Sequence, residues 1–144
     1  MSRVKDILSR KGGSIISVEP GTTVFNALNL MAEKNMGSVV VLTANNEFVG
    51  IVTERDYSRK VILKGKNSTS TEVSEIMTTD LPRVKPEDSI DHCMELMTIN
   101  NIRYLPVFVD EKLSGIISIS DVIKETILAQ QQTISHLENY IHSR

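Results

Sequence analysis

The fold is decided by a stretch that occurs twice, as Gly50-Ile51-Val52-Thr53-Glu54-Arg55-Asp56 and as Gly115-Ile116-Ile117-Ser118-Ile119-Ser120-Asp121. In both copies an apolar run, typical of a buried strand, leads into a hydroxyl residue and then an aspartate, a pattern that begins a helix. The two copies lie 65 positions apart. A duplicated unit is expected to pack against its copy about a pseudo-two-fold axis, so we expect function in the clefts between the copies.

The duplication extends upstream of this stretch, with matches 66 positions apart. The matching residues are Val18 and Val84, Pro20 and Pro86, Leu30-Met31 and Leu96-Met97, Asn35 and Asn101, and Val41 and Val107. Each copy therefore predicts the order strand, helix, strand, strand, helix. The expected strands are residues 15–18, 38–42 and 48–53 in the first copy, and 82–84, 104–108 and 113–118 in the second.

Each copy contains one helix with a clear apolar stripe and a second helix after the repeated stretch. The stripes follow the i, i+3, i+4, i+7 spacing of a helix that faces a core. They consist of Val24, Ala27, Leu28 and Met31 in the first copy, and Ile90, Cys93, Met94 and Met97 in the second. The second helices are expected to begin near Glu54 and near Ser120.

The expected domain organisation is a first repeat at residues 1–63, a polar linker at 64–72, a second repeat at 73–127 and a helical extension at 128–144. The extension continues an apolar stripe that needs a covering surface, which is either its own chain or a second copy in a homodimer. A dedicated docking helix for another protein is the less favoured alternative. The stripe consists of Ile123, Ile127, Ile134, Leu137 and Ile141.

Composition narrows the class of protein. The chain has 144 residues, a net charge of −2 and one cysteine, Cys93, and its pI is about 5.9. This charge disfavours nucleic acid or an anionic membrane as a partner, and the cysteine count suits a reducing compartment. No run approaches 18 apolar residues, so a soluble, cytoplasmic protein is expected.

The repeated motifs resemble a pair of CBS domains, a Bateman module. The resemblance rests on Val/Ile-x-Pro before the first helix, on the strand at Arg103-Tyr104-Leu105-Pro106-Val107 and on the two repeated stretches, and it covers roughly residues 3–127. It implies an α/β (α+β) fold of two βαββα repeats with pseudo-two-fold symmetry. It also implies adenosine-nucleotide binding between the repeats and frequent assembly into a disk-like homodimer.

The Thr53-x-x-Asp56 and Ser118-x-x-Asp121 elements suit a ribose-phosphate ligand. An aspartate in the first helical turn offers two acceptor oxygens to ribose hydroxyls, and helix N-terminal amides favour a nearby phosphate. The alternative is purely structural, in which Thr53 or Ser120 caps a helix and each aspartate complements the helix dipole.

The resemblance places adenine against the strand that follows the first helix of each copy, and arginines are the candidate phosphate ligands. Arg55 and Arg59 share a helix face, and Arg83 aligns with Ser17, so the Asp56 site is expected to be the more electropositive. Asp56 is expected to act with Arg83 and the second-copy strand, and Asp121 with Ser17 and the first-copy strand. The full candidate set is Ser17, Met36, Gly37, Ser38, Thr53, Arg55, Asp56, Arg59, Arg83, Ile102, Arg103, Tyr104, Leu105, Pro106, Ser118, Ser120 and Asp121. Lys60, Lys64 and Lys66 are expected to be solvated.

Catalysis is disfavoured because no nucleophile is paired with a base and no metal-ligand spacing occurs. The sequence therefore predicts a regulatory sensor with no catalytic residues, no metal and no cofactor. AMP is the preferred ligand, with ADP, ATP, NAD or S-adenosylmethionine as alternatives. A homodimer and a separate effector protein are the expected protein partners, and a structural dimerisation module without a ligand is the alternative function.

Overall fold

The computed structural model describes residues 2–12 and 14–142 and divides the chain into two compact units. The first-repeat unit is Ile15–Leu81. The second-repeat unit combines Pro82–Arg144 with the leading segment Met1–Ser14. Each unit contains a short leading segment that precedes the other repeat in sequence. Residues 3–11 pack in the second-repeat unit, and residues 73–78, which precede the second repeat, pack in the first-repeat unit.

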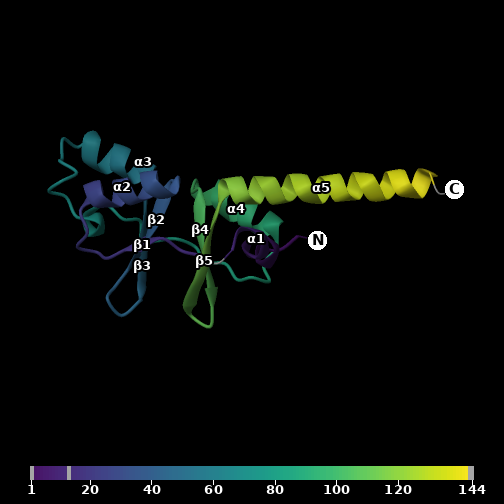
Figure 1. Cartoon of the computed structure of the whole chain (residues 1–144), viewed down its shortest axis with the longest axis horizontal. Helices are drawn as coiled ribbons and strands as arrows, with labels where there is room; N and C mark the ends of the chain where they lie inside the picture. The colour runs from purple at the N-terminus through teal and green to yellow at the C-terminus, as the bar shows by residue number, and fades with distance from the viewer. Residues whose placement is uncertain (1, 13, 143–144) are drawn as a thin grey trace. The chain divides into compact units, whose positions relative to one another are not determined.

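The first-repeat unit is a three-stranded sheet covered by helices (Figure 1). The strand order is β1-β2-β3, with β1 parallel and β3 antiparallel to β2. Apolar residues at alternate positions of β2 meet the stripe of α2 in one core, where Val24, Val39 and Val41 are fully or almost fully buried. Its elements are β1 (Ser17–Val18), α2 (Val24–Lys34), β2 (Ser38–Leu42), β3 (Phe48–Thr53), α3 (Glu54–Tyr57), the π-helical turn η1 (Ser58–Ile62) and the 3₁₀ turn η2 (Val73–Glu75).

The second-repeat unit repeats this plan around a separate core. Strands β4 and β5 form an antiparallel hairpin, and the opening strand is reduced to one parallel bridge between Val84 and Val107. The core gathers Cys93 and Met97 of α4, Leu105 and Val107 of β4, and residues of the leading helix. Its elements are α1 (Val4–Lys11), α4 (Ile90–Asn100), β4 (Tyr104–Val109), β5 (Lys112–Ser118) and α5 (Ile119–His142).

The leading segment of each unit lies against the repeated glycine of its strand. In the first-repeat unit, Thr78 bridges Ile51, and a Cβ at Gly50 would lie 2.9 Å from the Thr78 carbonyl oxygen. In the second-repeat unit, a Cβ at Gly115 would lie 2.8 Å from Cδ2 of Leu8. The glycines at this position therefore let a neighbouring segment approach the strand closely.

The matched asparagines Asn35 and Asn101 end α2 and α4. Both adopt the left-handed conformation, with φ of 53° and 51°, and their backbone N–H groups bond to the last turn of the helix. Asparagine tolerates this conformation better than most non-glycine residues, which explains its use at both helix ends. At the other ends, the Thr23 and Ser89 side chains accept hydrogen bonds from the backbone and act as N-caps.

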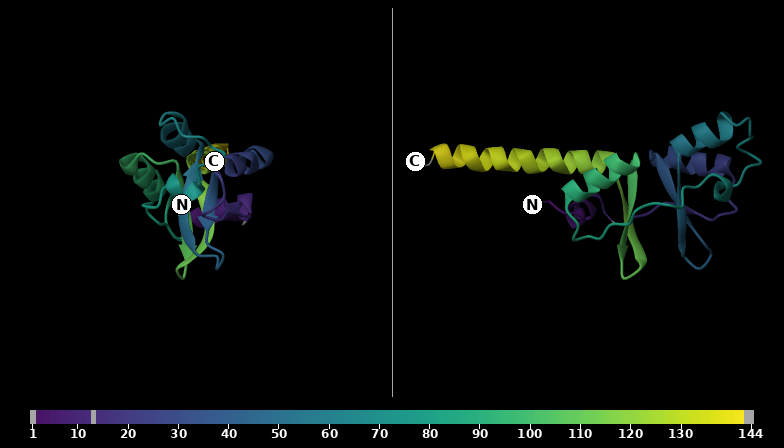
Figure 2. Two further views of the ribbon diagram at one scale, coloured as in Figure 1. Left: turned by 90° about the vertical axis from the view of Figure 1, so that its left-hand side faces the viewer. Right: turned by 180° about the vertical axis from the view of Figure 1, so that it is seen from behind.

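The predicted strands and helices are confirmed, with three differences. The strand expected at residues 82–84 is reduced to the single bridge between Val84 and Val107. Met94, expected in the core-facing stripe of α4, is 38% exposed, because the buried face of this helix is the narrower line of Ile90, Cys93 and Met97. Helix α5 begins at Ile119 and runs for 24 residues without a break, so the second helix of the repeat and the C-terminal extension are one element (Figure 2). Among the described helices, none is long and apolar enough to cross a membrane.

Candidate functional site

The predicted first-copy residues meet where β3 passes into α3. Ser38 pairs with Thr53 across the sheet, and the backbone N–H of Glu54 donates to the Gly37 carbonyl at 3.2 Å. Ser17 lies on the neighbouring strand, paired with Val40. The start of β2 and the start of α3 therefore form one edge of the first-repeat unit.

Asp56 is 7% exposed and is held from both oxygens. Its Oδ2 accepts from the backbone N–H of Thr53 at 3.0 Å and from the Thr53 hydroxyl at 3.1 Å. Its Oδ1 accepts from the Thr78 hydroxyl and from Lys60 Nζ, both at 3.1 Å. Because a carboxylate offers about four acceptor sites, a ribose at Asp56 would have to replace contacts within the protein.

The second-copy residues form the same arrangement in the second-repeat unit. Tyr104 pairs with Ser118, and the backbone N–H of Ile119 donates to the Arg103 carbonyl at 2.8 Å. The backbone N–H of Asp121 donates to the Ser118 hydroxyl at 3.1 Å, and Ser118 N–H donates to Asp121 Oδ2 at 2.8 Å. Ser118, rather than Ser120, therefore caps this helix, and Ser120 is exposed.

Lys11 of α1 reaches the Asp121 carboxylate. Its Nζ donates to Asp121 Oδ2 at 2.8 Å and to the Ile116 carbonyl at 2.9 Å. Partial burial pushes the pKa of Asp121 upward, but the hydrogen bonds from Lys11 and Ser118 and the Lys11 charge outweigh it and hold the pKa below its ordinary value. The hydrogen bonds that Lys11 Nζ and the Ser118 backbone N–H donate to this carboxylate both reach Oδ2.

The two junctions share a feature that the sequence did not indicate. At each, a lysine binds the aspartate and one backbone carbonyl: Lys60 binds Asp56 and the Ile76 carbonyl, whereas Lys11 binds Asp121 and the Ile116 carbonyl. Lys60, expected to be solvated, is 44% exposed at its side chain and in addition holds these two partners. The lysines do not align in sequence, since one follows the aspartate and the other comes from the leading helix, so repeat matching could not find them.

The adenine-strand candidates differ in burial. Ser38, Leu105 and Pro106 are buried, whereas Met36 and Arg103 are exposed. Gly37, Ile102 and Tyr104 are partly buried at the strand entrances. The entrances of β2 and β4 are therefore partly exposed beside each aspartate junction.

The arginine candidates are distributed over both units. Arg55 is partly buried on α3, and Arg59 is exposed on η1. Arg83 places its guanidinium 4.0 Å from the centroid of the Phe108 ring, which fixes its position through a cation–π contact. One lysine lies on each aspartate, Lys60 on Asp56 and Lys11 on Asp121, and the expected excess of positive charge at Asp56 stays a prediction. The allocation of Arg83 to the Asp56 site remains a prediction.

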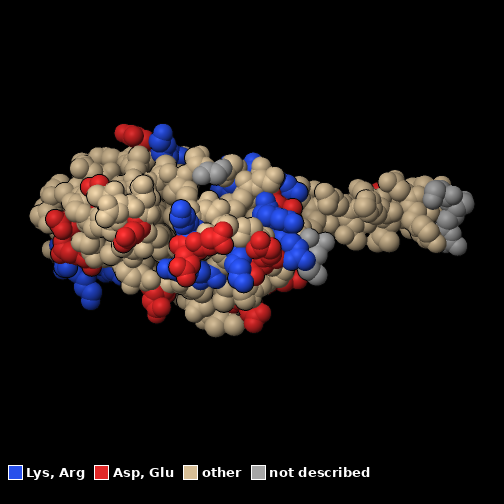
Figure 3. Space-filling model, turned by 90° about the horizontal axis from the view of Figure 1, so that it is seen from below, with Lys and Arg blue, Asp and Glu red and all other residues tan. Residues whose placement is uncertain are grey.

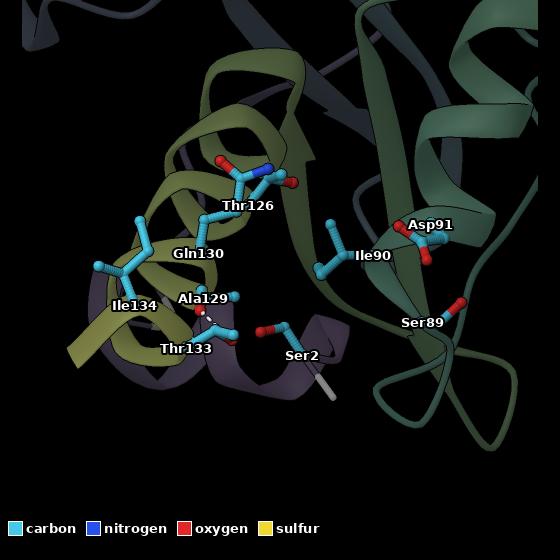
Figure 4. A pocket seen from close by; sticks show the side chains of 9 residues that line it. All are labelled: Ser2, Ser89, Ile90, Asp91, Thr126, Ala129, Gln130, Thr133 and Ile134. Carbon is cyan, nitrogen blue, oxygen red and sulfur yellow. Dashed lines mark hydrogen bonds between the residues drawn. The ribbon is translucent and has the colours of Figure 1, made fainter. Parts of the chain in front are cut away.

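A hollow of about 460 Å³ lies away from these junctions, in the second-repeat unit (Figure 4). It opens between the start of α4 and the middle of α5, and none of the predicted site residues lines it. Its lining is Ser2, Ser89, Ile90, Asp91, Thr126, Ala129, Gln130, Thr133 and Ile134. No group of three or more His, Cys, Asp or Glu side chains in the described part of the chain is placed to hold a metal ion.

Two tandem units with a repeated strand-to-helix aspartate junction define a CBS-pair protein. The CBS domain family matches residues 4–62 and 73–127, and the chain belongs to that family. It is 36% identical over 146 residues to the CBS domain-containing protein CBSX3, mitochondrial, of Arabidopsis thaliana, covering 96% of this chain and 71% of the plant protein.

Solved structures share the fold. A protein with CBS domains from Burkholderia ambifaria MC40-6 superposes with a TM-score of 0.85 at 43% identity, covering 90% of this chain and 96% of that one. The CBS domain pair of protein MJ0100, solved in complex with 5'-methylthioadenosine and S-adenosyl-L-methionine, has a TM-score of 0.76 at 24% identity, covering 86% of this chain and 94% of that one.

Proposed function

We propose that this chain is a regulatory module that binds an adenosine nucleotide, with AMP preferred, at its two aspartate junctions. The observation that carries the proposal is the repeated geometry, in which a carboxylate and a hydroxyl lie beside the exposed entrance of a strand in both units. Carboxylates suit ribose hydroxyls, strand entrances suit a flat base, and arginines suit phosphate. ADP, ATP, NAD and S-adenosylmethionine remain alternative ligands.

The hydrogen bonds favour Asp121 as the first ribose contact. Asp56 accepts hydrogen bonds at both oxygens within its own unit, whereas the bonds from Lys11 Nζ and the Ser118 N–H to Asp121 both reach Oδ2. This differs from the charge pattern in the sequence, which favours Asp56. A ligand phosphate would also be attracted by Lys11, whose amine lies 2.8 Å from Asp121.

The proposed assembly is a homodimer that acts on a separate effector protein. A ligand changes such an assembly only by binding one arrangement better than another. One relative, the hexameric CBS-CP12 protein from bloom-forming cyanobacteria, is 30% identical with a TM-score of 0.75, and its assembly differs from the dimer proposed for this chain.

The second candidate function is a structural dimerisation module. The capping contacts favour it, because Thr53 and Ser118 cap their helices and both aspartates already serve the fold. In that case the junctions stabilise the two units and bind no nucleotide.

A thermal-shift panel decides between the two functions. Nucleotide-stripped protein is heated with AMP, ADP, ATP, NAD or S-adenosylmethionine, because a ligand at 100 times its Kd adds about 2.7 kcal/mol to stability.

Calorimetric titration of Asp56→Asn and Asp121→Asn then locates the contact, because the amide keeps the shape of the carboxylate while removing its charge. Asp91→Asn on the exposed face of α4 is the matched control.

We expect a selective rise in melting temperature that Asp121→Asn reduces most. A larger loss in Asp56→Asn would move the main contact to the first-repeat unit. No rise with any nucleotide, from protein that is folded and stripped, would leave the structural module as the function.

A further inference from the structure

Helix α5 carries an apolar face that the described chain does not cover. Ile123 and Ile127 are 45% and 48% exposed, and Ile134, Leu137 and Ile141 are between 55% and 63% exposed. The other side of the same helix packs into its unit through Val122 and Glu125. Helix α5 continues past the other elements of its unit (Figure 1), and the exposed stripe follows it to Ile141.

The stripe has the spacing of a coiled-coil seam. Gln130 fills the gap in the apolar series, so that the seam positions 123, 127, 130, 134, 137 and 141 are separated by alternating steps of four and three. Such alternation over nearly three heptads keeps one face of a helix toward a partner helix. A single polar seam residue among apolar ones is also typical of paired helices.

The C-terminal half of α5 buries little of its surface in the described chain. Every residue from 130 to 142 is exposed. A helix of about 12 residues is marginal in water without tertiary packing. It is also nearly free of charge, since Glu138 is the one Asp, Glu, Lys or Arg between residues 126 and 142 (Figure 3). A helix with one formal charge and an exposed apolar stripe along one face favours a partner surface over that stripe.

We propose that the partner is α5 of a second copy, packed antiparallel along the seam. This extends the homodimer proposed above by naming its contact, and it does not depend on nucleotide binding. When two copies run in opposite directions, all six seam positions find partners: Ile123 faces the partner's Ile141, Ile127 faces the partner's Leu137, and Gln130 faces the partner's Ile134. The seam is thus complementary to itself.

Charge complementarity sets the direction. Lys124 and Glu138 lie on the same flank of the seam. Lys124 is N-terminal to the midpoint of the seam, and Glu138 is C-terminal to it. Antiparallel packing brings Lys124 next to the partner's Glu138, and the symmetry makes this pair twice. Parallel packing would instead place Thr126 beside the partner's Gln131 and Thr133 beside the partner's Glu138, which forms no ion pair. Flanking charges of this kind fix partner choice and orientation in coiled coils.

The hollow of about 460 Å³ lies along the opposite flank of the same seam. Its lining includes the flanking residues Thr126 and Thr133 and the seam residues Gln130 and Ile134. In the antiparallel arrangement the partner's Tyr140 falls beside Thr126, at the edge of this hollow. A large amphipathic ring thus meets a concave surface that α5 forms with the start of α4 (Figure 4).

Charge reversal tests the pairing. Lys124→Glu and Glu138→Lys should each weaken dimerisation on the order of tenfold, because each replaces two attractions by two repulsions. The double variant should recover most of the wild-type Kd in sedimentation equilibrium. The two positions lie 14 residues apart, about 21 Å along one helix, so they can meet only between copies. Lys112→Glu and Glu111→Lys, in the β4–β5 turn, are the charge-matched controls.

Spin-label distances give an independent measurement of direction. Labels on Gln131→Cys should lie close together across the dimer, whereas labels on Thr126→Cys should be separated by about 18 Å along the axis, and both variants keep Lys124 and Glu138. Cys93, the sole cysteine in the sequence, is buried and should stay unlabelled. Equal short distances at both positions, or a dimer in which the double reversal is no better than the single ones, would overturn the antiparallel pairing while leaving the homodimer in place. A chain that stays monomeric would overturn both, and nucleotide binding would still be judged separately.

Discussion

Gly50 and Gly115 occupy the same position in the two repeats, but an added Cβ would meet different neighbours. At Gly50 it would lie 2.9 Å from the backbone carbonyl of Thr78, which cannot move without breaking the pairing of Thr78 with Ile51. At Gly115 the close atom is the end of the Leu8 side chain, which can change rotamer. We expect Gly50→Ala to destabilise by about 1–3 kcal/mol and Gly115→Ala by less.

Urea unfolding of the two alanine variants measures this difference. Gly21→Ala provides a control, since a Cβ there would have nothing within 4 Å. An equal cost at Gly50 and Gly115 would show that the Thr78 carbonyl yields as readily as the Leu8 side chain.

The ionisation of Asp121 should make the free energy of unfolding depend on pH in the acid range. The fold lowers its pKa, mainly through Lys11 and Ser118 acting against the effect of burial, so the folded state favours the ionised carboxylate. Its contribution is complete above the ordinary carboxyl pKa of about 4 and is lost as pH falls through the lower folded value. Asp121→Asn and Lys11→Met should therefore both flatten the loss of stability between about pH 5 and pH 2. If both variants lose stability with falling pH as steeply as the wild type does, the Lys11–Asp121 pair is not the source of the pH dependence.

At the scale of elements, each leading segment completes the core of its unit. Val4 and Ile7 of α1 are 0% and 4% exposed and belong to the same core as α4 and β4, although α1 precedes the first repeat in the sequence. Val73 and Ile76 play the same part in the first-repeat unit. A repeat without its leading segment would therefore expose one side of its core.

Ile7→Ala tests this role of α1. Removing a buried isoleucine side chain should cost about 2–5 kcal/mol. Ile99→Ala on α4 is the matched control, because Ile99 is 72% exposed and should have little effect. Thermal unfolding followed by circular dichroism compares the two, and similar melting temperatures would mean that α1 is not part of the stable core.

The sequence predicted the elements well because their signals are local. The stripe at Val24, Ala27 and Met31 and the alternation of Val39 and Val41 follow directly from helix and strand geometry. The pairing of each repeat with its leading segment could not be predicted in the same way, because it depends on contacts between residues such as Leu8 and Gly115, far apart in the chain. For the same reason repeat matching identified Asp56 and Asp121 but missed Lys11 and Lys60.

At the scale of the whole molecule, the chain has two cores of similar design and one long helix that serves two purposes. The first turns of α5 close the core of the second-repeat unit through Val122, and the exposed seam begins beside them at Ile123 and continues to Ile141. One continuous helix contains both the core residue Val122 and the seam. A change in how the start of α5 packs in the second-repeat unit would therefore move the seam. This continuity is a physical route from the Ser118–Asp121 junction, at the start of α5, to the proposed dimer contact.

Truncation after Ile127 separates the role of α5 in the core of the second-repeat unit from its proposed role in dimerisation. It keeps Val122 and Glu125, so both units should fold, but it removes four of the six seam positions and should abolish or strongly weaken dimerisation. The melting temperature of the full chain should rise with protein concentration, since association stabilises the folded state, whereas that of the truncated chain should not. Sedimentation velocity at matched concentrations gives the size of each species directly. A truncated chain that sediments as the same dimer would place the contact between copies on another surface and would leave the exposed seam without a role in self-association.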